Sequence, residues 1–210
     1  MATFQATAIA RRIKRSVGEQ TFCQVNGQNV VKMKIEENTS NTPAQQRQRR
    51  IFTELSDWGN IFGEAAALGF PTRQRQLSVQ NAFMQANAEV VSVSEEGEIT
   101  VDYTQIACSK GRLDVPKVTV TCTGEPPVLT FTHPAQKNGR CRKATDRLYA
   151  AVLEKELEEV EVFELNKRSE AEAVTAELDE AWKKENLCVY VFMLSENGDK
   201  ASDTKYVEVS

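Results

Sequence analysis

The sequence predicts an α+β protein, in which an N-terminal β-hairpin and two helices are followed by an antiparallel β-sandwich. Three observations support this fold class: an Asn-Gly turn between β-favouring runs, an apolar stripe at helical spacing, and a series of short alternating strands. The 210 residues are 40% hydrophobic and 27% charged, which are ordinary globular proportions. We predict three segments: residues 1–40, a basic arm and β-hairpin; 41–96, a helical segment; and 97–210, the sandwich.

The N-terminal hairpin is predicted by Asn26-Gly27, which lies between β-favouring runs at residues 21–25 and 28–32. Asn-Gly accepts positive φ at both central positions of a type I′ turn, which matches the twist of the flanking strands. A two-stranded hairpin is only marginally stable in water, and no third strand is evident nearby. We therefore expect the hairpin to pack on the rest of the chain or on another molecule.

A long helix is predicted to begin at Thr42, which can cap it, with Pro43 at the first helical position and Gln45 completing a capping box. Apolar residues then recur at spacings of three and four along one stripe: Ile51, Phe52, Leu55, Trp58, Ile61, Phe62, Ala65 and Leu68. Gly69-Phe70-Pro71 ends this helix, and Thr72 begins a second, shorter one. The apolar residues of the second helix are Leu77, Val79, Phe83 and Ala86.

From about residue 97 the pattern changes to short strands separated by Gly, Pro and Asn turns. The predicted strands are residues 98–102, 118–122, 128–132, 147–153, 159–163, 173–178, 187–194 and 205–209. So many short strands in about 110 residues favour an antiparallel sandwich of immunoglobulin or fibronectin type III style. We expect Trp58 of the long helix to be buried against this sandwich or against a neighbouring subunit.

The sequence predicts neither a membrane span nor an export signal. No run of about 18 apolar residues occurs, and charges lie where a signal peptide needs its apolar region. The five cysteines form an odd number without a C-x-x-C pair, which argues against a disulfide framework or a zinc site. They are Cys23, Cys108, Cys122, Cys141 and Cys188. We expect free thiols and synthesis in a reducing cytoplasm.

Charge is distributed in blocks along the chain, although the net charge is only −4. Residues 1–50 carry nine Lys or Arg against three acids, whereas residues 51–100 carry two against seven. Residues 101–150 carry eight against four, and residues 151–210 carry seven against sixteen. Such blocks suit head-to-tail packing between copies, or a basic arm that binds an acidic partner.

Two groups of basic residues are the candidate partner-binding residues. They are Arg11, Arg12, Lys14 and Arg15 in the arm, and Arg47, Arg49 and Arg50 on the first turns of the long helix. Positive charge near a helix N-terminus opposes the macrodipole, so these arginines are expected to pair with acids or to bind a negatively charged partner. Only Phe4 and Phe22 are aromatic in the basic block, which disfavours nucleic-acid binding.

The sequence contains no recognisable catalytic or cofactor motif. Its single histidine, His133, lacks the further residues that a triad or a metal site requires. No G-x-S-x-G, phosphate-binding or dinucleotide-binding glycine motif occurs. The glutamates of residues 154–164 alternate with apolar residues, as on the solvated face of a sheet. We therefore predict no enzymatic activity, no cofactor and no catalytic, cofactor-binding or metal site.

Three stretches resemble a family of domains of unknown function that is abundant in Bacteroidota and their mobile elements. Residues 102–113 (D-Y-T-Q-I-A-C-S-K-G-R-L) resemble its D-Y-S-K-V-x-x-S-x-G-x-L stretch, and residues 146–152 resemble its D-K-L-x-x-x-V strand. Residues 189–206 are similar to its closing V-Y-L-F-F-x-S-x-D-G-K-x-x-S-D-S-x-Y motif. The resemblance covers most of the chain and implies no enzymatic activity.

A second resemblance covers residues 41–52, which are similar to the N-P-x-T-x-A-Q-x-x-Q-R-x-x-F element of phage and prophage virion proteins. Together the two resemblances imply a non-enzymatic structural virion protein of a bacteriophage of Bacteroidota, in the neck, ring, tail or capsid-accessory class. Its expected partners are other virion subunits, including copies of itself in a ring or array, without a membrane and without an expected DNA contact. The expected location is the virion, and the host cytoplasm during assembly.

Two other classes remain as alternatives at this point. The first is a bacterial envelope or adhesin-like binding module built on the same sandwich. The second is a nucleic-acid binder that uses the basic N-terminal block. The missing export signal favours the virion over the envelope module, because virion subunits assemble in the host cytoplasm.

Overall fold

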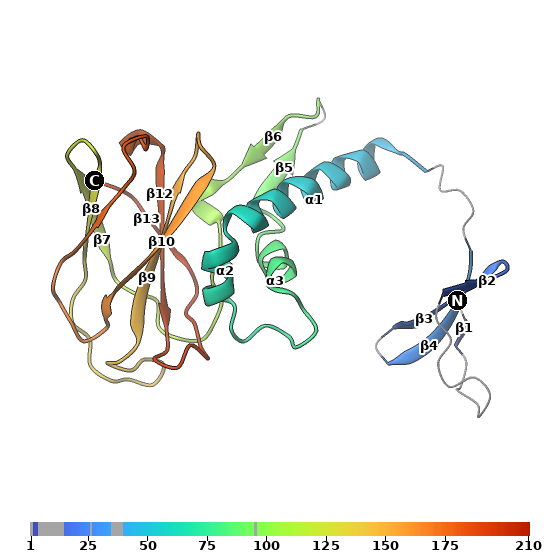
Figure 1. Cartoon of the computed structure of the whole chain (residues 1–210), viewed down its shortest axis with the longest axis horizontal. Coiled ribbons are helices and arrows are strands. Elements are labelled where there is room, and N and C mark those ends of the chain that lie inside the picture. The colour runs from blue at the N-terminus through green and yellow to red at the C-terminus, as the bar shows by residue number, and fades with distance from the viewer. Residues whose placement is uncertain (1, 4–14, 26, 35–39, 95) are drawn as a thin grey trace. The chain divides into compact units, whose positions relative to one another are not determined.

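A computed structural model gives the fold of most of the chain (Figure 1). The described residues are 2–3, 15–25, 27–34, 40–94 and 96–210. They fall into two separate compact units, Met1–Pro43 and Ala44–Ser210. The predicted α+β class is confirmed, with an N-terminal hairpin and mostly antiparallel sheets in the described residues.

The first unit contains a four-stranded sheet in the order β1-β4-β3-β2. The predicted hairpin is confirmed, since β3 (Gln20–Val25) pairs antiparallel with β4 (Gln28–Met33). The expectation that no third strand lies nearby is wrong, because β2 (Arg15–Val17) pairs with β3 and β1 (Ala2–Thr3) pairs with β4. These two edge strands are too short for an alternating hydrophobic pattern to reveal them.

The turn between β3 and β4 requires a left-handed backbone at Gly27, whose φ is +83°. A glycine adopts this conformation without a Cβ clash, which explains its place in the hairpin. Asn26, the other predicted turn residue, lies outside the described residues. Within the sheet, Val30 is buried and its cross-strand neighbour Cys23 is half-buried.

The helical segment forms three helices rather than the predicted two: α1 (Pro43–Ile61), α2 (Gly63–Gly69) and α3 (Val79–Ala86). The expected single helix is interrupted at Phe62, whose φ of −83° and ψ of 12° leave the helical region. Phe62 is fully buried and precedes Gly63, a residue type of low helix propensity. The change of direction at this residue lets both halves pack on the same sheet.

The third helix begins later than predicted, at Val79 rather than at Thr72. The hydroxyl of Ser78 caps it by accepting a hydrogen bond from the backbone N–H of Asn81 at 3.1 Å. The Ser78 cap satisfies a backbone N–H that has no partner within the helix. Leu77 consequently lies in the connection between α2 and α3.

Each of the eight strands predicted after residue 97 has a counterpart in the second unit. They are β6 (Ile99–Val101), β7 (Thr119–Thr123), β8 (Val128–Thr132), β9 (Arg147–Glu154), β10 (Glu159–Lys167), β11 (Val174–Glu177), β12 (Leu187–Leu194) and β13 (Lys205–Val207). All of them except β6 form two sheets, one in the order β10-β9-β12-β13 and another in the order β11-β8-β7. The unpredicted β5 (Val91–Val93) pairs with β6 in a separate ribbon, which spans the predicted segment boundary at residue 97.

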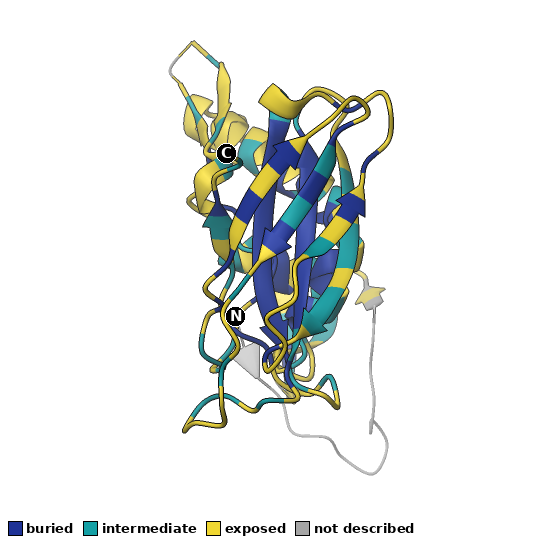
Figure 2. Cartoon of the chain, turned by 90° about the vertical axis from the view of Figure 1, so that its left-hand side faces the viewer, coloured by how far each residue is buried: buried dark blue, intermediate teal, exposed yellow. Residues whose placement is uncertain are grey.

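The central strands β9 and β12 are buried on both faces, as the dark blue strands of Figure 2 show. On one face, Leu148, Ala150 and Val152 alternate into an apolar cluster shared with β7, β8 and β11. On the other face, Tyr149 and Leu153 join a second cluster shared with α1, α2 and α3. The second unit therefore has three layers: the β11-β8-β7 sheet, the β10-β9-β12-β13 sheet in the middle, and the helices.

Trp58 of α1 is buried, as expected, in the apolar cluster that also contains residues of β9 and β12. Only 3% of it is exposed, and its ring lies 5.6 Å from that of Tyr103 in an edge-on arrangement. Its indole N–H donates to Glu54 Oε1 at 2.9 Å, so the polar end of the ring is satisfied. The C-terminal half of α1 thus belongs to the apolar cluster between the helices and strands β9 and β12.

Polar contacts also join the end of α3 and strand β12 to the connection that follows β6. The amide of buried Asn87 donates to the carbonyl oxygens of Phe83 and Ala107 at 2.8 Å and accepts from the Ala107 N–H at 2.7 Å. The hydroxyl of Tyr190 donates to the carbonyl oxygen of Tyr103 at 2.7 Å. These contacts satisfy groups that would otherwise destabilise the buried helix–sheet junction.

Two glycines permit close backbone approaches at this junction. A Cβ at Gly69 would collide with the carbonyl oxygen of Cys108, and a Cβ at Gly111 with that of Ala201. Gly111 belongs to the motif at residues 102–113, and Ala201 lies within the closing motif at 189–206. The two motifs are therefore in close contact, and the absence of a side chain at Gly111 permits that contact.

Candidate assembly surface

The described residues hold no cluster of three or more metal-ligating side chains. His133 follows β8, where its Nε2 lies 2.6 Å from Asn166 Oδ1 and its Nδ1 lies 3.2 Å from the carbonyl oxygen of Pro134. Both ring nitrogens are thus engaged with neighbouring loop atoms. The arrangement positions the β8 loop against the end of β10.

All five cysteines are free thiols, and three of them are buried. Burial raises the pKa of the Cys108 thiol to about 12, and it also raises the pKa of Cys122 and Cys188. A raised pKa keeps a thiol protonated at neutral pH, and the thiolate is the nucleophile. These three groups therefore pack as apolar side chains.

We expect two classes of thiol reactivity in the folded chain. At pH 8, a thiol reagent should modify Cys23 and Cys141, which are half-buried, within minutes, and leave Cys108, Cys122 and Cys188 unmodified. Five thiols should react after denaturation without reductant. Counting modified cysteines by intact-mass spectrometry checks both numbers, and rapid labelling of Cys108 in the folded state would contradict the assignment.

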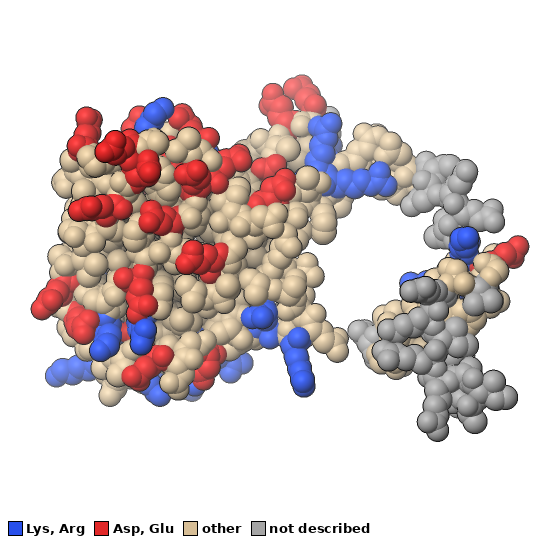
Figure 3. Space-filling model, viewed as in Figure 1, with Lys and Arg blue, Asp and Glu red and all other residues tan. Residues whose placement is uncertain are grey.

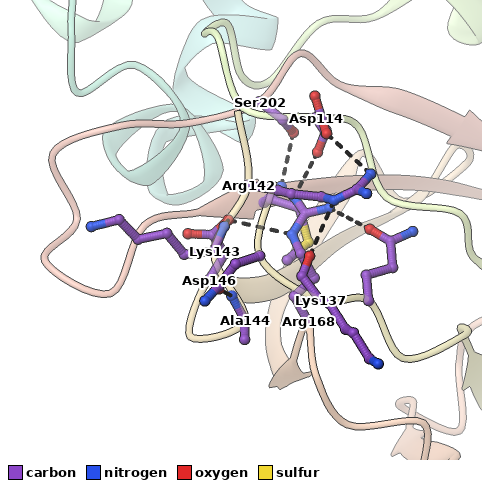
Figure 4. A network of polar contacts seen from close by, with 11 residues as sticks. Asp114, Lys137, Arg142, Lys143, Ala144, Asp146, Arg168 and Ser202 are labelled. Carbon is purple, nitrogen blue, oxygen red and sulfur yellow. Dashed lines mark hydrogen bonds and ion pairs between the residues drawn. The ribbon is translucent and has the colours of Figure 1, made fainter. Parts of the chain in front are cut away.

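The most buried ion pair links the ends of β9 and β10 (Figure 4). Arg168 Nε lies 3.3 Å from Asp146 Oδ2, and their side chains are 2% and 1% exposed. Arg168 also donates to the Asp114 carbonyl oxygen at 2.6 Å and to Gln136 Oε1 at 2.7 Å. The Lys143 N–H donates to Asp146 Oδ2 at 2.7 Å. This network fixes the long β8–β9 connection to the sheet, so its role is structural.

The first half of α1 extends beyond the packed core of the second unit (Figure 1). Every residue from 43 to 50 is exposed, whereas Leu55 and Trp58 are buried one to two turns later. At 1.5 Å per residue, the exposed turns extend for about 12 Å. Helical packing thus stops near Ile51, and the preceding turns present their side chains to solvent.

Phe52, which the sequence places on the apolar stripe of the long helix, lies outside the core. It is 60% exposed, because the apolar stripe of α1 continues past the end of the core. Its ring borders a shallow hollow that is otherwise lined by Gln45, Gln48, Arg49 and Thr53. An exposed aromatic ring beside an arginine is the composition that protein interfaces favour.

The three helix arginines of the predicted partner-binding set lie on the first turns of α1, with Arg47 and Arg50 on one side and Arg49 on another. Arg47, Arg49 and Arg50 are all exposed, and no acidic residue lies in the first turn of the helix. Arg50 Nη1 donates to the carbonyl oxygen of Gly97 at 3.1 Å, so it ties α1 to the turn between β5 and β6. Sequence reasoning missed this contact, because β5 was not predicted.

Of the four basic residues of the arm, only Arg15 belongs to the part of the chain that the structure describes. Arg11, Arg12 and Lys14 lie outside the described residues, and Arg15 begins β2. Arg15 therefore belongs to the first unit, and the helix arginines to the second.

Acidic side chains are exposed on the strands of the second unit. Figure 3 shows acidic side chains spread over the strands and basic ones at the free end of α1 and along the lower margin. Glu64 of α2, Glu161 of β10 and Asp179 after β11 are all exposed. Desolvation, then the nearby charges of Asp179 and Glu64, raise the pKa of Glu161.

Comparison with known proteins leaves the function to be argued from these surfaces. No family model, curated protein or solved structure matches the chain. No helix among the described residues is both long enough and apolar enough to cross a membrane.

Proposed function

We propose that this chain is a non-enzymatic structural protein that acts by assembly, as a virion subunit of a bacteriophage of Bacteroidota. The observation that carries the proposal is the exposed half of α1, with Phe52 and three arginines beyond the packed core. An exposed aromatic side chain such as Phe52 gains buried apolar area when another surface covers it. The neck, ring, tail and capsid-accessory positions all need subunits with such surfaces.

The layered sheets support the finer fold proposal, a sandwich of immunoglobulin or fibronectin type III style. The sheets β10-β9-β12-β13 and β11-β8-β7 are antiparallel and share one apolar core. Seven strands of three to nine residues match the size of such domains. The helices that cover the second face of β9 and β12 would be an addition to that scaffold.

The buried polar groups support a structural role over a catalytic one. Arg168 and Asp146 hold loops to the sheet, and Asn87 at the end of α3 and Tyr190 of β12 both hold the connection that follows β6. The strongly perturbed thiol Cys108 is completely buried and bonds within the helix–strand junction through Thr204. Each of these groups therefore already has a packing role.

Particles purified from the host that carries the gene provide the test. The proposal predicts that peptides of this chain sediment with the major capsid protein through a density gradient, at a constant ratio across the particle peak. A cytoplasmic host enzyme, followed in the same fractions, is the negative control. Recovery of the chain in the envelope fraction, or its absence from washed particles, would overturn the proposal.

A further inference from the structure

We propose that the basic turn, residues 137–143, docks in the hollow beside Trp182 at the opposite end of the second unit of another copy of this chain. The inference rests on the proposed function, since it names surfaces through which the subunit assembles. It is carried by the geometry and charge of the turn, by the walls of the Trp182 hollow, and by the strand register that places the two at opposite ends.

The basic turn belongs to the connection between β8 and β9. Four of its seven residues are basic and none is acidic. The Gly139 N–H donates to the Arg142 carbonyl oxygen at 2.9 Å, and the Asp114 N–H donates to the Cys141 carbonyl oxygen, also at 2.9 Å. Arg140 therefore lies at the tip of a bridged turn whose backbone is fixed to the preceding connection.

Two cations of the basic turn are available to a partner. Lys137 and Arg140 are exposed, and the four ion pairs between described residues include neither of them. The other two cations are engaged, because Arg142 pairs with Asp114 at 3.4 Å and Lys143 lies near the Asp199 carboxylate. The tip of the turn thus presents positive charge that the described part of the chain does not neutralise.

The Trp182 hollow has a volume of about 630 Å³, which is within the range of ligand pockets, about 300–1,000 Å³. One wall is the turn between β7 and β8, residues 124–127, and the other is formed by Glu180 and residues 182–185 of the β11–β12 connection. The Leu178 N–H donates to the Pro127 carbonyl oxygen at 3.1 Å, which holds the two walls together. The hollow is therefore a built feature of this end of the sheets.

The lining of the Trp182 hollow suits an arginine side chain. Its indole wall offers an aromatic ring, and a guanidinium binds both aromatic rings and carboxylates. Glu125 and Glu180 supply exposed carboxylates, and none of the four ion pairs between described residues includes them.

The two lysines of the hollow already have partners. Lys183 Nζ donates to Glu156 Oε2 at 3.0 Å, and Lys184 Nζ donates to the Cys122 carbonyl oxygen at 3.3 Å. They therefore leave Glu125 and Glu180 without a basic partner in the described residues. An arginine from another molecule would complete the pairing.

The strand register separates the turn from the hollow of its own chain. At one end of β9 and β12, Arg147 pairs with Leu194, and at the other end Glu154 pairs with Leu187. The basic turn leads into Arg147, whereas the β11–β12 connection leads into Leu187 (Figure 1). The eight residues of β9 span about 25 Å at roughly 3.3 Å per residue. A fixed turn cannot cross this distance, so the contact joins two copies.

This contact joins two different surfaces, so it is heterologous. Each pair of copies keeps one free basic turn and one free Trp182 hollow. A heterologous contact generates a ring where the rotation closes and an open array where it does not. The inferred geometry therefore agrees with a subunit that is repeated around a particle axis.

The test uses two charge-reversed forms of the full chain. One carries Lys137→Glu with Arg140→Glu, and the other carries Glu125→Lys with Glu180→Lys. By sedimentation equilibrium, each variant alone should self-associate at least roughly tenfold more weakly than the wild type, since like charges then face each other. An equimolar mixture should recover association, because every contact in it can join opposite charges.

The matched control reverses two exposed carboxylates outside the hollow, Glu64→Lys with Glu89→Lys, and should associate like the wild type. Wild-type association should weaken as salt rises, since exposed charges are screened beyond about 10 Å at 0.1 M. Circular dichroism establishes that the strands of each variant remain folded. Where a reversed variant does not fold, the neutral pairs Lys137→Gln with Arg140→Gln and Glu125→Gln with Glu180→Gln replace the reversed ones. A mixture of the two neutral forms should stop at a dimer, since only one native contact can form.

Three outcomes would overturn the inference. They are a wild-type chain that stays monomeric at every concentration, equal association of the wild type and the folded end variants, and loss of DNA binding without loss of self-association in the Lys137 and Arg140 variant. A monomeric chain that still sediments with particles would remove this inference and leave the proposed function standing. Self-association through the two ends by a chain absent from particles would do the reverse.

Discussion

Replacing Arg168 with methionine is expected to lower the free energy of unfolding by about 3–5 kcal/mol, because it leaves the Asp146 carboxylate charged, buried and unpaired. The Asp146 side chain is 1% exposed, so water cannot substitute for the guanidinium. The same substitution also removes the donors to the Asp114 carbonyl oxygen and to Gln136. Urea unfolding, followed by circular dichroism, measures the change.

The matched control is Arg147→Met, which breaks the ion pair with Glu164. That pair is bonded at 2.9 Å, but its side chains are 42% and 49% exposed. Its loss should change stability by no more than about 1 kcal/mol. Adding Asp146→Asn to Arg168→Met should restore part of the lost stability, because the buried charge disappears. Equal effects of Arg168→Met and Arg147→Met would show that burial does not set the strength of the network.

Truncating Phe62 to alanine is expected to destabilise the second unit by about 3–5 kcal/mol, through lost burial and a cavity. Phe62 is fully buried, and its ring centroid lies 5.6 Å from that of Phe83 and 5.5 Å from that of Tyr190. It therefore contributes to contacts between α1, α3 and β12 at once. The midpoint and slope of urea unfolding report the loss.

Phe52→Ala is the control for Phe62→Ala, since it removes the same ring from the same segment of chain. Phe52 is 60% exposed, and its truncation should change the stability of the monomer by less than about 0.5 kcal/mol. The proposed function predicts that this variant nevertheless assembles more weakly, because Phe52 lies on the exposed half of α1. A large loss of monomer stability in Phe52→Ala would mean that the exposed half of α1 packs on its own chain.

The strands after residue 97 could be predicted because their patterns are long enough and are bounded by turn residues. β5 and the edge strands β1 and β2 could not, since two or three residues show no periodicity. The stripe predicted where α1 begins, but neither the break at Phe62 nor the extent of the core. A 3.6-residue period shows which face is apolar, whereas only the tertiary structure shows where the neighbouring layer ends.

The candidate site, like the fold, could be predicted only in part from the sequence. Arg47, Arg49 and Arg50 could be picked out from their charge and their place near a helix start. The bond between Arg50 and Gly97 could not, because it depends on the turn between β5 and β6, and β5 is too short to show periodicity. The two-sided burial of β12 was also hidden, since a continuous apolar run in the sequence does not distinguish its two covering layers.

The burial of β9 and β12 on both faces sets how the second unit opens to solvent. Their backbone amides should exchange hydrogen only when the whole unit unfolds, whereas those in the first turns of α1 should exchange through local fraying. The exposed end of α1, which we propose meets a partner, thus has its own local equilibrium, separate from that of the central strands. Substitutions that redirect α1 to a new partner can therefore accumulate without drawing on the stability of the strands, so partner choice and fold can evolve independently.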